Sequence, residues 1–272
     1  MSLLNILIII FALTAASKDD RKIEKKNSDT FVEIAKASST TKDFTDKITT
    51  HSYQTMYGMF LVPLAKASKR DGSKVKLLEI GLGCAMAYGP GKSVYVWRKL
   101  FGESGEIWEA EFNAECAQKL NATGTLKGIN ILVGNQESNI TVNEWIATTG
   151  GKFDVIIDDG GHTNAQIRNS FDILFAKALL PGGLYFIEDL QVGRSKKYAA
   201  VGVPVFADII QSYIEQLLIP DSYLTEKQFS EYSALQRKLY PIPKNIKWIL
   251  CQHEACVIAK CETASCAPTE FD

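Results

Sequence analysis

The chain has 272 residues, of which 46% are hydrophobic and 22% are charged, and its formal net charge is −1. This length and composition are those of one globular domain with extensions. Because the charge is balanced and basic residues form only short runs, nucleic acid is a poor candidate partner.

The chain begins with an uncharged apolar segment, residues 3–16, which precedes a dense run of charges at residues 18–26. The segment is too short for a membrane span of about 20 residues but has the length of a signal-peptide core. We therefore expect residues 1–17 to be a signal peptide cleaved near Ala16, or a short signal-anchor, and to be the only contact with a membrane. The protein would then enter the secretory pathway, as a lumenal, secreted or anchored form, or would face the cytosol from its anchor.

Residues 18–40 are polar and charged without sustained periodicity, which predicts a linker. A single domain is expected over residues 41–262, followed by a tail at residues 263–272. Its first element is a helix within residues 51–67 that ends or is interrupted near Pro63, because proline lacks the amide proton of the helical hydrogen bond.

Strands and helices alternate through the rest of this domain. The apolar patterns predict strands at residues 75–80, 107–110, 129–133, 153–157 and 184–187, and helices at residues 93–101, 113–120, 139–149, 163–179 and 205–218. A hairpin of residues 246–251 and 256–260 ends the domain. The alternation predicts an α/β fold with a mostly parallel sheet, to which the hairpin adds an antiparallel edge.

Two of the predicted strands end in acidic residues. Residues 153–157 run into Asp158-Asp159-Gly160-Gly161-His162, and residues 184–187 run into Glu188-Asp189. Ligands of parallel sheets bind at the carboxyl ends of the strands, so these side chains should meet in one crevice. Hard oxygen ligands suit Mg²⁺ or Mn²⁺, and a neutral histidine suits proton abstraction.

We therefore assign metal binding to Asp159, Glu188 and Asp189, and the role of general base to His162. The alternative for the acids is helix capping or loop closure. The alternative for His162 is capping of the helix that follows it.

The first strand of the sheet runs into a glycine-rich turn, Glu79-Ile80-Gly81-Leu82-Gly83-Cys84-Ala85. A dinucleotide fingerprint needs a third glycine where this chain has Met86, so a nicotinamide dehydrogenase is disfavoured. The spacing is instead typical of the E-x-G-x-G-x-(G/A) turn of S-adenosylmethionine (SAM) methyltransferases. Glu79, Gly81 and Gly83 are therefore expected at the cofactor, and Glu111, at the end of the next strand, is expected to hold the ribose hydroxyls.

From about residue 41 to residue 260 the chain resembles metal-dependent SAM O-methyltransferases of the macrolide-sugar (mycinamicin) type and the associated cephalosporin-hydroxylase-like group. The motifs that carry the resemblance are Thr45-Asp46-Lys47, His51-x-Tyr53-x-x-x-Tyr57, the Glu79 glycine turn, Val133-Gly134-Asn135-Gln136, Asp158-Asp159-Gly160-Gly161-His162, and Pro181-Gly182-Gly183-Leu184-Tyr185-Phe186-Ile187-Glu188-Asp189. The resemblance implies a class I methyltransferase, Rossmann-like fold. It also implies Mg²⁺ at Asp159, Glu188 and Asp189, with His162 as the base.

One motif departs from that family, which usually has Gly-Asp-Gln where this chain has Gly134-Asn135-Gln136. Asparagine can still bind an adenine through hydrogen bonds, so Asn135 and Gln136 are assigned to cofactor binding. Asp158 is grouped with them, in a supporting or structural role. His51, Tyr53 and Tyr57 are expected either to line the pocket or to belong to the core.

These features predict a SAM-dependent, Mg²⁺-assisted O-methyltransferase acting on a hydroxyl of a small molecule or sugar. One alternative is a metal-dependent hydrolase or glycosyltransferase of the secretory pathway, which would not bind SAM. Another is a non-catalytic SAM-fold binding protein.

Four of the six cysteines, Cys251, Cys256, Cys261 and Cys266, are spaced five apart, which is not a zinc-ligand spacing. A two-residue turn in the hairpin would set Cys251 opposite Cys256 at a non-hydrogen-bonded site, where Cα atoms approach to ~4.5 Å. This predicts a Cys251–Cys256 disulfide, and Cys261–Cys266 as a second one, in an oxidising compartment.

Cys84 and Cys116 are expected to be buried free thiols. Two sequons, Asn121-Ala122-Thr123 and Asn139-Ile140-Thr141, are compatible with glycosylation in a lumen.

Overall fold

The computed structural model describes residues 21–39, 44–87, 89–219, 231–263 and 266. The chain divides into two compact units, one formed by the residues up to Lys74 together with Lys92–Ser104, the other by Val75–Gly91 and the residues from Gly105 onward. The signal segment predicted for residues 1–17 lies outside the described residues. Among the helices that are described, none has the length and apolar character needed to cross a membrane.

The smaller unit is helical. Residues 21–37 form its first helix, which is followed by η1 (Asp46–Ile48), α2 (Gln54–Asp71), α3 (Lys92–Phe101) and η2 (Gly102–Ser104). The linker predicted for residues 18–40 is therefore wrong for residues 21–37. Asn27, Phe31 and Ala35 recur every four residues and are buried, so this mostly polar helix has one narrow buried stripe.

Aromatic rings fill the core of this unit. Phe31 stacks on Tyr57 with ring centroids 5.3 Å apart, and Trp97 and Tyr57 form a T-shaped pair with centroids 5.2 Å apart. Tyr53 is also fully buried, so Tyr53 and Tyr57 are core residues, the second of the two readings expected for them. The predicted break near Pro63 is wrong, because α2 continues through this exposed proline to Asp71 and buries side chains before and after it.

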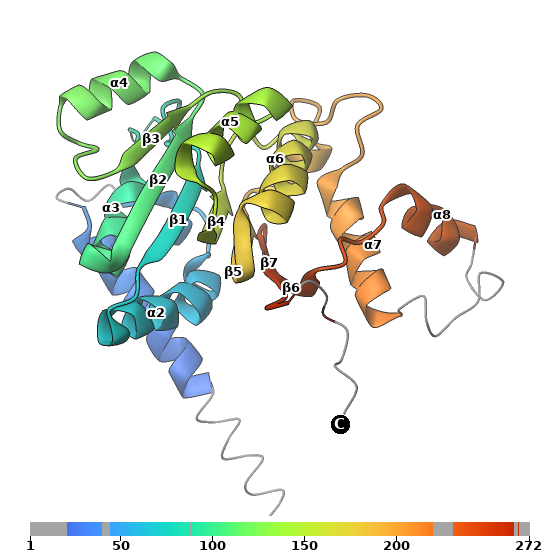
Figure 1. Cartoon of the computed structure of the whole chain (residues 1–272), viewed down its shortest axis with the longest axis horizontal. Coiled ribbons are helices and arrows are strands. Elements are labelled where there is room, and N and C mark those ends of the chain that lie inside the picture. Colours follow the sequence, from blue (N-terminus) through green and yellow to red (C-terminus); the bar gives the residue numbers. More distant parts are fainter. Residues whose placement is uncertain (1–20, 40–43, 88, 220–230, 264–265, 267–272) are drawn as a thin grey trace, which may run out of the picture. The chain divides into compact units, whose positions relative to one another are not determined.

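The larger unit is built on a seven-stranded sheet in the order β3-β2-β1-β4-β5-β7-β6 (Figure 1). Its strands are β1 (Val75–Ile80), β2 (Gly105–Glu111), β3 (Asn130–Val133), β4 (Phe153–Asp158), β5 (Leu179–Ile187), β6 (Ile246–Cys251) and β7 (Cys256–Lys260). The first five are parallel, and β7 runs antiparallel to both of its neighbours. The predicted α/β fold with a C-terminal antiparallel hairpin is confirmed.

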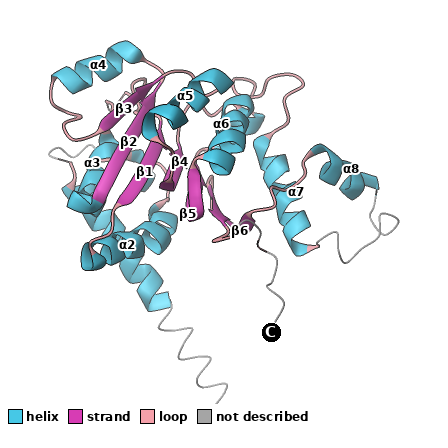
Figure 2. Cartoon of the chain, viewed as in Figure 1, coloured by secondary structure: helices cyan, strands magenta, loops and turns pink. Residues whose placement is uncertain are grey.

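The helices of this unit are α4 (Ala114–Ala122), α5 (Asn139–Thr149), α6 (Asn164–Lys177), α7 (Phe206–Leu218) and α8 (Glu231–Leu239), with the short η3 (Leu190–Arg194). Helices α5, α6 and α7 lie along one face of the sheet (Figure 2). Alternate strand residues face these helices. The resulting core contains Leu78, Ile156 and Tyr185 from the strands and Trp145, Phe171 and Phe206 from the helices.

The C-terminal hairpin agrees with the prediction in detail. Cys251 pairs with Cys256 across β6 and β7, and the Gln252 amide donates to the Ala255 carbonyl at 2.9 Å. A disulfide joins the two cysteines, whose Cα atoms lie 4.1 Å apart. The Cys261–Cys266 disulfide is present too.

The free thiols expected at Cys84 and Cys116 are wrong, since these residues form a third disulfide. They are separated by 32 residues and meet only because β1 and β2 are neighbours in the sheet. All six cysteines of the chain are thus paired.

Candidate functional site

The candidate site lies at the carboxyl ends of β1, β4 and β5, which are adjacent parallel strands. The Asp159 amide donates to the Ile80 carbonyl, and the Glu188 amide donates to the Asp158 carbonyl, each at 3.0 Å. Backbone hydrogen bonds of the sheet therefore continue into the loops that follow the strands. These bonds fix the backbone positions of Asp159 and Glu188, the residues that directly follow β4 and β5.

Asp159, His162 and Asp189 form a cluster that is able to hold a metal ion, because their ligand atoms all lie within 4.8 Å of one another. The His162 Nε2 atom is 3.9 Å from Asp159 Oδ1 and 3.6 Å from Asp189 Oδ2. Each side chain keeps about one fifth of its surface exposed. Two carboxylates and an imidazole that are reachable from solvent suit a divalent cation.

Two members of this cluster have an unusual backbone conformation. His162 has a φ of 58° and Asp189 a φ of 56°, in the left-handed region that residues other than glycine rarely adopt. Such strained residues concentrate at ligand-binding and catalytic sites, where the surrounding structure over-determines them. The backbone conformation of His162 and Asp189 thus agrees with a functional role for this edge of the sheet.

The two glycines before His162 pack closely against glutamine side chains. A Cβ atom at Gly160 would collide with the Gln136 side chain, and one at Gly161 would collide with the Gln166 side chain. Helix α6 is capped by Thr163, whose side chain accepts from the Gln166 amide in a capping box. His162 precedes this cap, so the reading of His162 as a helix cap is wrong.

Glu188, the third predicted metal ligand, is not a member of the cluster found among the described residues. It is only 2% exposed and directly follows β5. The structure thus brings together two of the three predicted carboxylates, with His162 as their nearest neighbour.

Asp158 and Gln136 lie beneath the cluster in a buried polar network. The Gln136 Nε2 group donates to Asp158 Oδ1 at 2.9 Å, and its Oε1 atom accepts from the Gly161 amide at 2.9 Å. Ser170 and Tyr185 donate their hydroxyl protons to the other oxygen of Asp158. Burial raises the pKa of the Asp158 carboxyl, and the hydrogen bonds from Ser170 and Gln136 oppose that shift. Asp158 and Gln136 therefore hold the Gly160–His162 loop in place. This is the supporting role expected of Asp158.

The glycine-rich turn after β1 meets the metal loop directly. Gly81 has a φ of 106°, and a Cβ atom there would collide with the backbone carbonyl of Asp159. Gly83 also has a positive φ, 77°. Glu79, by contrast, lies within β1, is fully buried, and is paired in register with Glu109 of β2. Gly81 thus lies at the site, Gly83 follows it in the same turn, and Glu79 lies inside the sheet.

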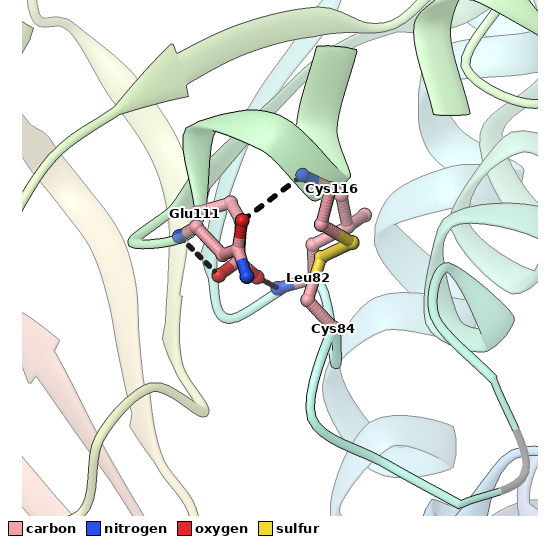
Figure 3. Close-up of a disulfide and its surroundings, with 5 residues drawn as sticks. Leu82, Cys84, Glu111 and Cys116 are labelled. Carbon is pink, nitrogen blue, oxygen red and sulfur yellow. Dashed lines mark hydrogen bonds between the residues drawn. A yellow bond between two sulfur atoms is a disulfide. The ribbon is translucent and has the colours of Figure 1, made fainter. Parts of the chain in front are cut away.

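Glu111 is held at the end of β2 with its carboxylate over the glycine turn (Figure 3). Its Oε2 atom accepts from the Leu82 amide at 3.2 Å, and its Oε1 atom accepts from the Asn113 amide at 2.7 Å. Asn135, after β3, accepts from the Glu137 amide at 2.9 Å. Both residues lie at the carboxyl edge of the sheet, as predicted.

Two residues near the site, Phe112 and Tyr198, have no motif that marks them in the sequence, and a third, Val133, is marked only as the first residue of the Val133-Gly134-Asn135-Gln136 motif. Phe112 is 73% exposed and Val133 is 44% exposed, although both follow or end strands of the sheet. Large apolar side chains left in solvent beside Glu111 suit the face of a planar ring. The rings of Tyr198 and His162 are T-shaped to one another, with their centroids 6.3 Å apart. An aromatic residue directly after a strand-end acid is the one signal that points to Phe112, while nothing local points to Tyr198.

Comparison with known proteins gives relatives but no matching family model. The chain is 37% identical over 119 residues to a demethylmacrocin O-methyltransferase of Streptomyces fradiae, covering 43% of this chain and 28% of that protein. It is 34% identical over 119 residues to a mycinamicin VI 2''-O-methyltransferase of Micromonospora griseorubida, covering 43% of this chain and 27% of that one. The chain therefore spans about a quarter to a third of the length of these curated relatives.

Among solved structures, the chain is similar to the MycE methyltransferase from the mycinamycin biosynthetic pathway, determined in complex with Mg, SAH and mycinamycin VI. The TM-score is 0.55 at 23% sequence identity, over 85% of this chain and 53% of that one. The resemblance expected from the motifs is confirmed: the chain has the class I methyltransferase fold, and two fifths of its sequence is similar to macrolide-sugar O-methyltransferases.

Proposed function

We propose that this protein transfers a methyl group from SAM to a hydroxyl of a small molecule or sugar, with the assistance of a divalent metal ion. The observation that carries the proposal is the contact between the two halves of the site. Gly81 of the glycine turn abuts the backbone of Asp159, and Asp159 belongs to the cluster with His162 and Asp189. A methyl donor and a metal-binding group would therefore be neighbours.

Glu111 keeps the capacity to bind ribose. Each of its oxygens accepts one backbone amide among the described residues, and a carboxylate oxygen accepts two hydrogen bonds. Phe112 and Val133, beside it at the ends of β2 and β3, offer apolar surface for an adenine ring. Gln136 has both side-chain groups engaged inside the protein, so we assign it to the support of the metal loop and leave the adenine to Asn135.

Asp159 and Asp189 would hold the metal ion, and their hard oxygen donors fit Mg²⁺ or Mn²⁺. A bound ion of this kind lowers the pKa of an acceptor hydroxyl. His162, whose Nε2 atom lies 3.6 Å from Asp189 Oδ2, would accept the hydroxyl proton at that atom. The partly exposed Tyr198 ring beside His162 would flank the acceptor.

We also propose that the domain works in an oxidising compartment of the secretory pathway, with residues 1–17 as its signal peptide or anchor. Three disulfides support this assignment, as do the exposed sequon residues Asn121 and Asn139. Such a location requires SAM to be imported from the cytosol. An anchored domain facing the cytosol would instead keep these cysteines reduced.

Calorimetric titration of the full chain with SAM, with and without Mg²⁺, tests the function. We expect SAM to bind in both conditions, and methyl transfer from labelled SAM to a panel of glycosides to occur only with the metal. Metal-dependent hydrolysis without SAM binding would support the hydrolase alternative. SAM binding without transfer to any glycoside would support a non-catalytic binding protein.

A further inference from the structure

The disulfide between Cys84 and Cys116 connects the two segments that form the cofactor side of the site. Cys84 lies in the glycine turn after β1, and Cys116 lies in the first turn of α4, which follows β2 (Figure 3). The other two disulfides join cysteines only five residues apart. The Cys84–Cys116 bond is therefore the one long-range covalent link at this edge of the sheet.

Hydrogen bonds connect the same two segments beside this disulfide. Glu111 accepts from the Leu82 amide on the glycine turn and from the Asn113 amide at the start of α4. Asn113 in turn caps α4 by accepting from the Cys116 amide at 3.0 Å. The carboxylate that is expected to bind ribose is thus held by the same two segments that the disulfide joins.

Backbone hydrogen bonds hold the two ends of the glycine turn, from the Gly81 amide to the Ala110 carbonyl and from the Gly91 amide to the Leu82 carbonyl, each at 2.8 Å. The backbone between these ends depends on glycines. Gly81, Gly83, Gly89 and Gly91 all have positive φ angles, and glycine loses more conformational freedom on ordering than any other residue. The Leu82–Glu111 hydrogen bond, at 3.2 Å, is a long one. A covalent link beside these glycines restricts the turn before any ligand arrives.

We propose that Cys84 and Cys116 are positioning residues for the cofactor, so that the redox state of their disulfide sets the affinity for SAM. Reduction by a dithiol would transfer two electrons and two protons to the sulfurs, producing two thiols while the dithiol forms its own disulfide. The freed turn must then be ordered at the cost of binding energy. This inference rests on the proposed function.

The metal side should not respond to this change. Asp159 and Asp189 follow β4 and β5. The Asp159 amide donates to the carbonyl of Ile80, the last residue of β1, and the Leu190 amide, next to Asp189, donates to the Glu254 carbonyl. Neither bond passes through the residues that the Cys84–Cys116 link restrains. We therefore expect the loss of the disulfide to raise the dissociation constant of SAM by about tenfold, while the affinity for Mn²⁺ stays unchanged.

The experiment compares the oxidised full chain with a Cys84→Ser/Cys116→Ser variant by titration with SAM and, separately, with Mn²⁺ followed by electron paramagnetic resonance. The matched control is Cys261→Ser/Cys266→Ser. It removes a disulfide whose Cys261 carbonyl accepts from Gly182, near the opposite end of β5. We expect SAM affinity to fall only in the first variant.

A folded first variant with unchanged SAM affinity would overturn the inference, as would an equal loss in the control or a parallel loss of Mn²⁺ affinity. If that variant does not fold, the native protein is reduced with a dithiol and reoxidised. Hydrogen exchange of residues 82–91 should then rise and recover together with the SAM dissociation constant, and a constant exchange rate would reject the idea. Failure of the oxidised wild-type chain to bind SAM would instead refute the proposed function.

Discussion

The cofactor side and the metal side of the candidate site achieve their geometry by different means. The cofactor side uses glycines with positive φ at positions 81 and 83, backbone amides bound to Glu111, and a disulfide. The metal side uses side chains on a strained backbone, at His162 and Asp189, above the buried network of Asp158.

The difference follows from which part of the chain must approach the ligand. On the cofactor side the backbone itself must approach a large ligand, so glycine, which has no side chain, is used there. Glycine also makes the backbone more flexible, and a cross-link reduces that flexibility. On the metal side, side chains must converge on an ion, so the backbone adopts a strained conformation. A buried hydrogen-bond network stabilises that conformation. Substitutions on the first side should therefore change SAM affinity, and substitutions on the second should change turnover.

The largest effect should come from the base. His162→Ala should lower turnover by roughly 10²–10⁴, the usual span for a positioned proton acceptor, because the hydroxyl proton loses its acceptor. SAM affinity, measured by calorimetry, should not change. The control is His253→Ala, whose side chain is 82% exposed in the hairpin turn. Full turnover in His162→Ala would remove His162 from the mechanism.

Asp189→Asn should come next. It removes one of the two carboxylates of the cluster, and we expect turnover at saturating SAM to fall by about 10²–10³, as for several kcal/mol of lost metal assistance. Asp172→Asn, on the exposed side of α6, serves as the control. An Asp189→Asn protein that keeps its activity and its sensitivity to EDTA would contradict the assignment.

Gly81→Ala tests the cofactor side. The new Cβ atom would collide with the Asp159 carbonyl, so SAM affinity should fall by about 10-fold or more through displacement of the turn. Gly128→Ala is matched, because Gly128 also has a positive φ but has open space around it. Equal losses in the two variants would attribute the effect to backbone strain alone.

Tyr198→Ala should have a smaller effect that is confined to the acceptor. Removal of the ring beside His162 should raise the KM for a glycoside acceptor by about tenfold and leave the SAM dissociation constant unchanged. Tyr198→Phe keeps the ring and should behave as wild type. A loss in Tyr198→Phe equal to that in Tyr198→Ala would assign the role to the hydroxyl.

The smallest effect concerns stability and pH. Burial raises the pKa of Asp158, so its contribution to stability is fully present below the unfolded-state pKa of about 3.9 and is lost as pH rises through the higher folded-state value. Asp158→Asn carries no charge and should lack this loss. Melting curves from pH 4 to pH 8 should show the variant gaining about 2–4 °C on wild type as pH rises. Parallel curves would mean that Asp158 stays ionised at no cost.

Local features of the sequence were sufficient to predict the fold and the edge of the sheet at which the candidate site lies. The alternation of apolar runs predicted the parallel sheet, and the strand-end acids and glycines marked the edge where Gly81, Asp159 and Asp189 meet. The Cys251–Cys256 disulfide followed from strand register alone. These properties depend on residues close in sequence, whose periodicity and turn chemistry can be read directly.

Only the tertiary structure decided the rest. It buried Glu188 and paired Cys84 with Cys116. It also packed Phe31, from a mostly polar helix, against Tyr57 and brought Tyr198 to His162. These contacts join segments that are far apart in the chain. Hydrophobic periodicity does not indicate which distant residue a given side chain will contact. Such contacts arise when strand order brings loops together, and for this reason the sequence determined the edge on which the site lies, while folding determined which side chains face one another there.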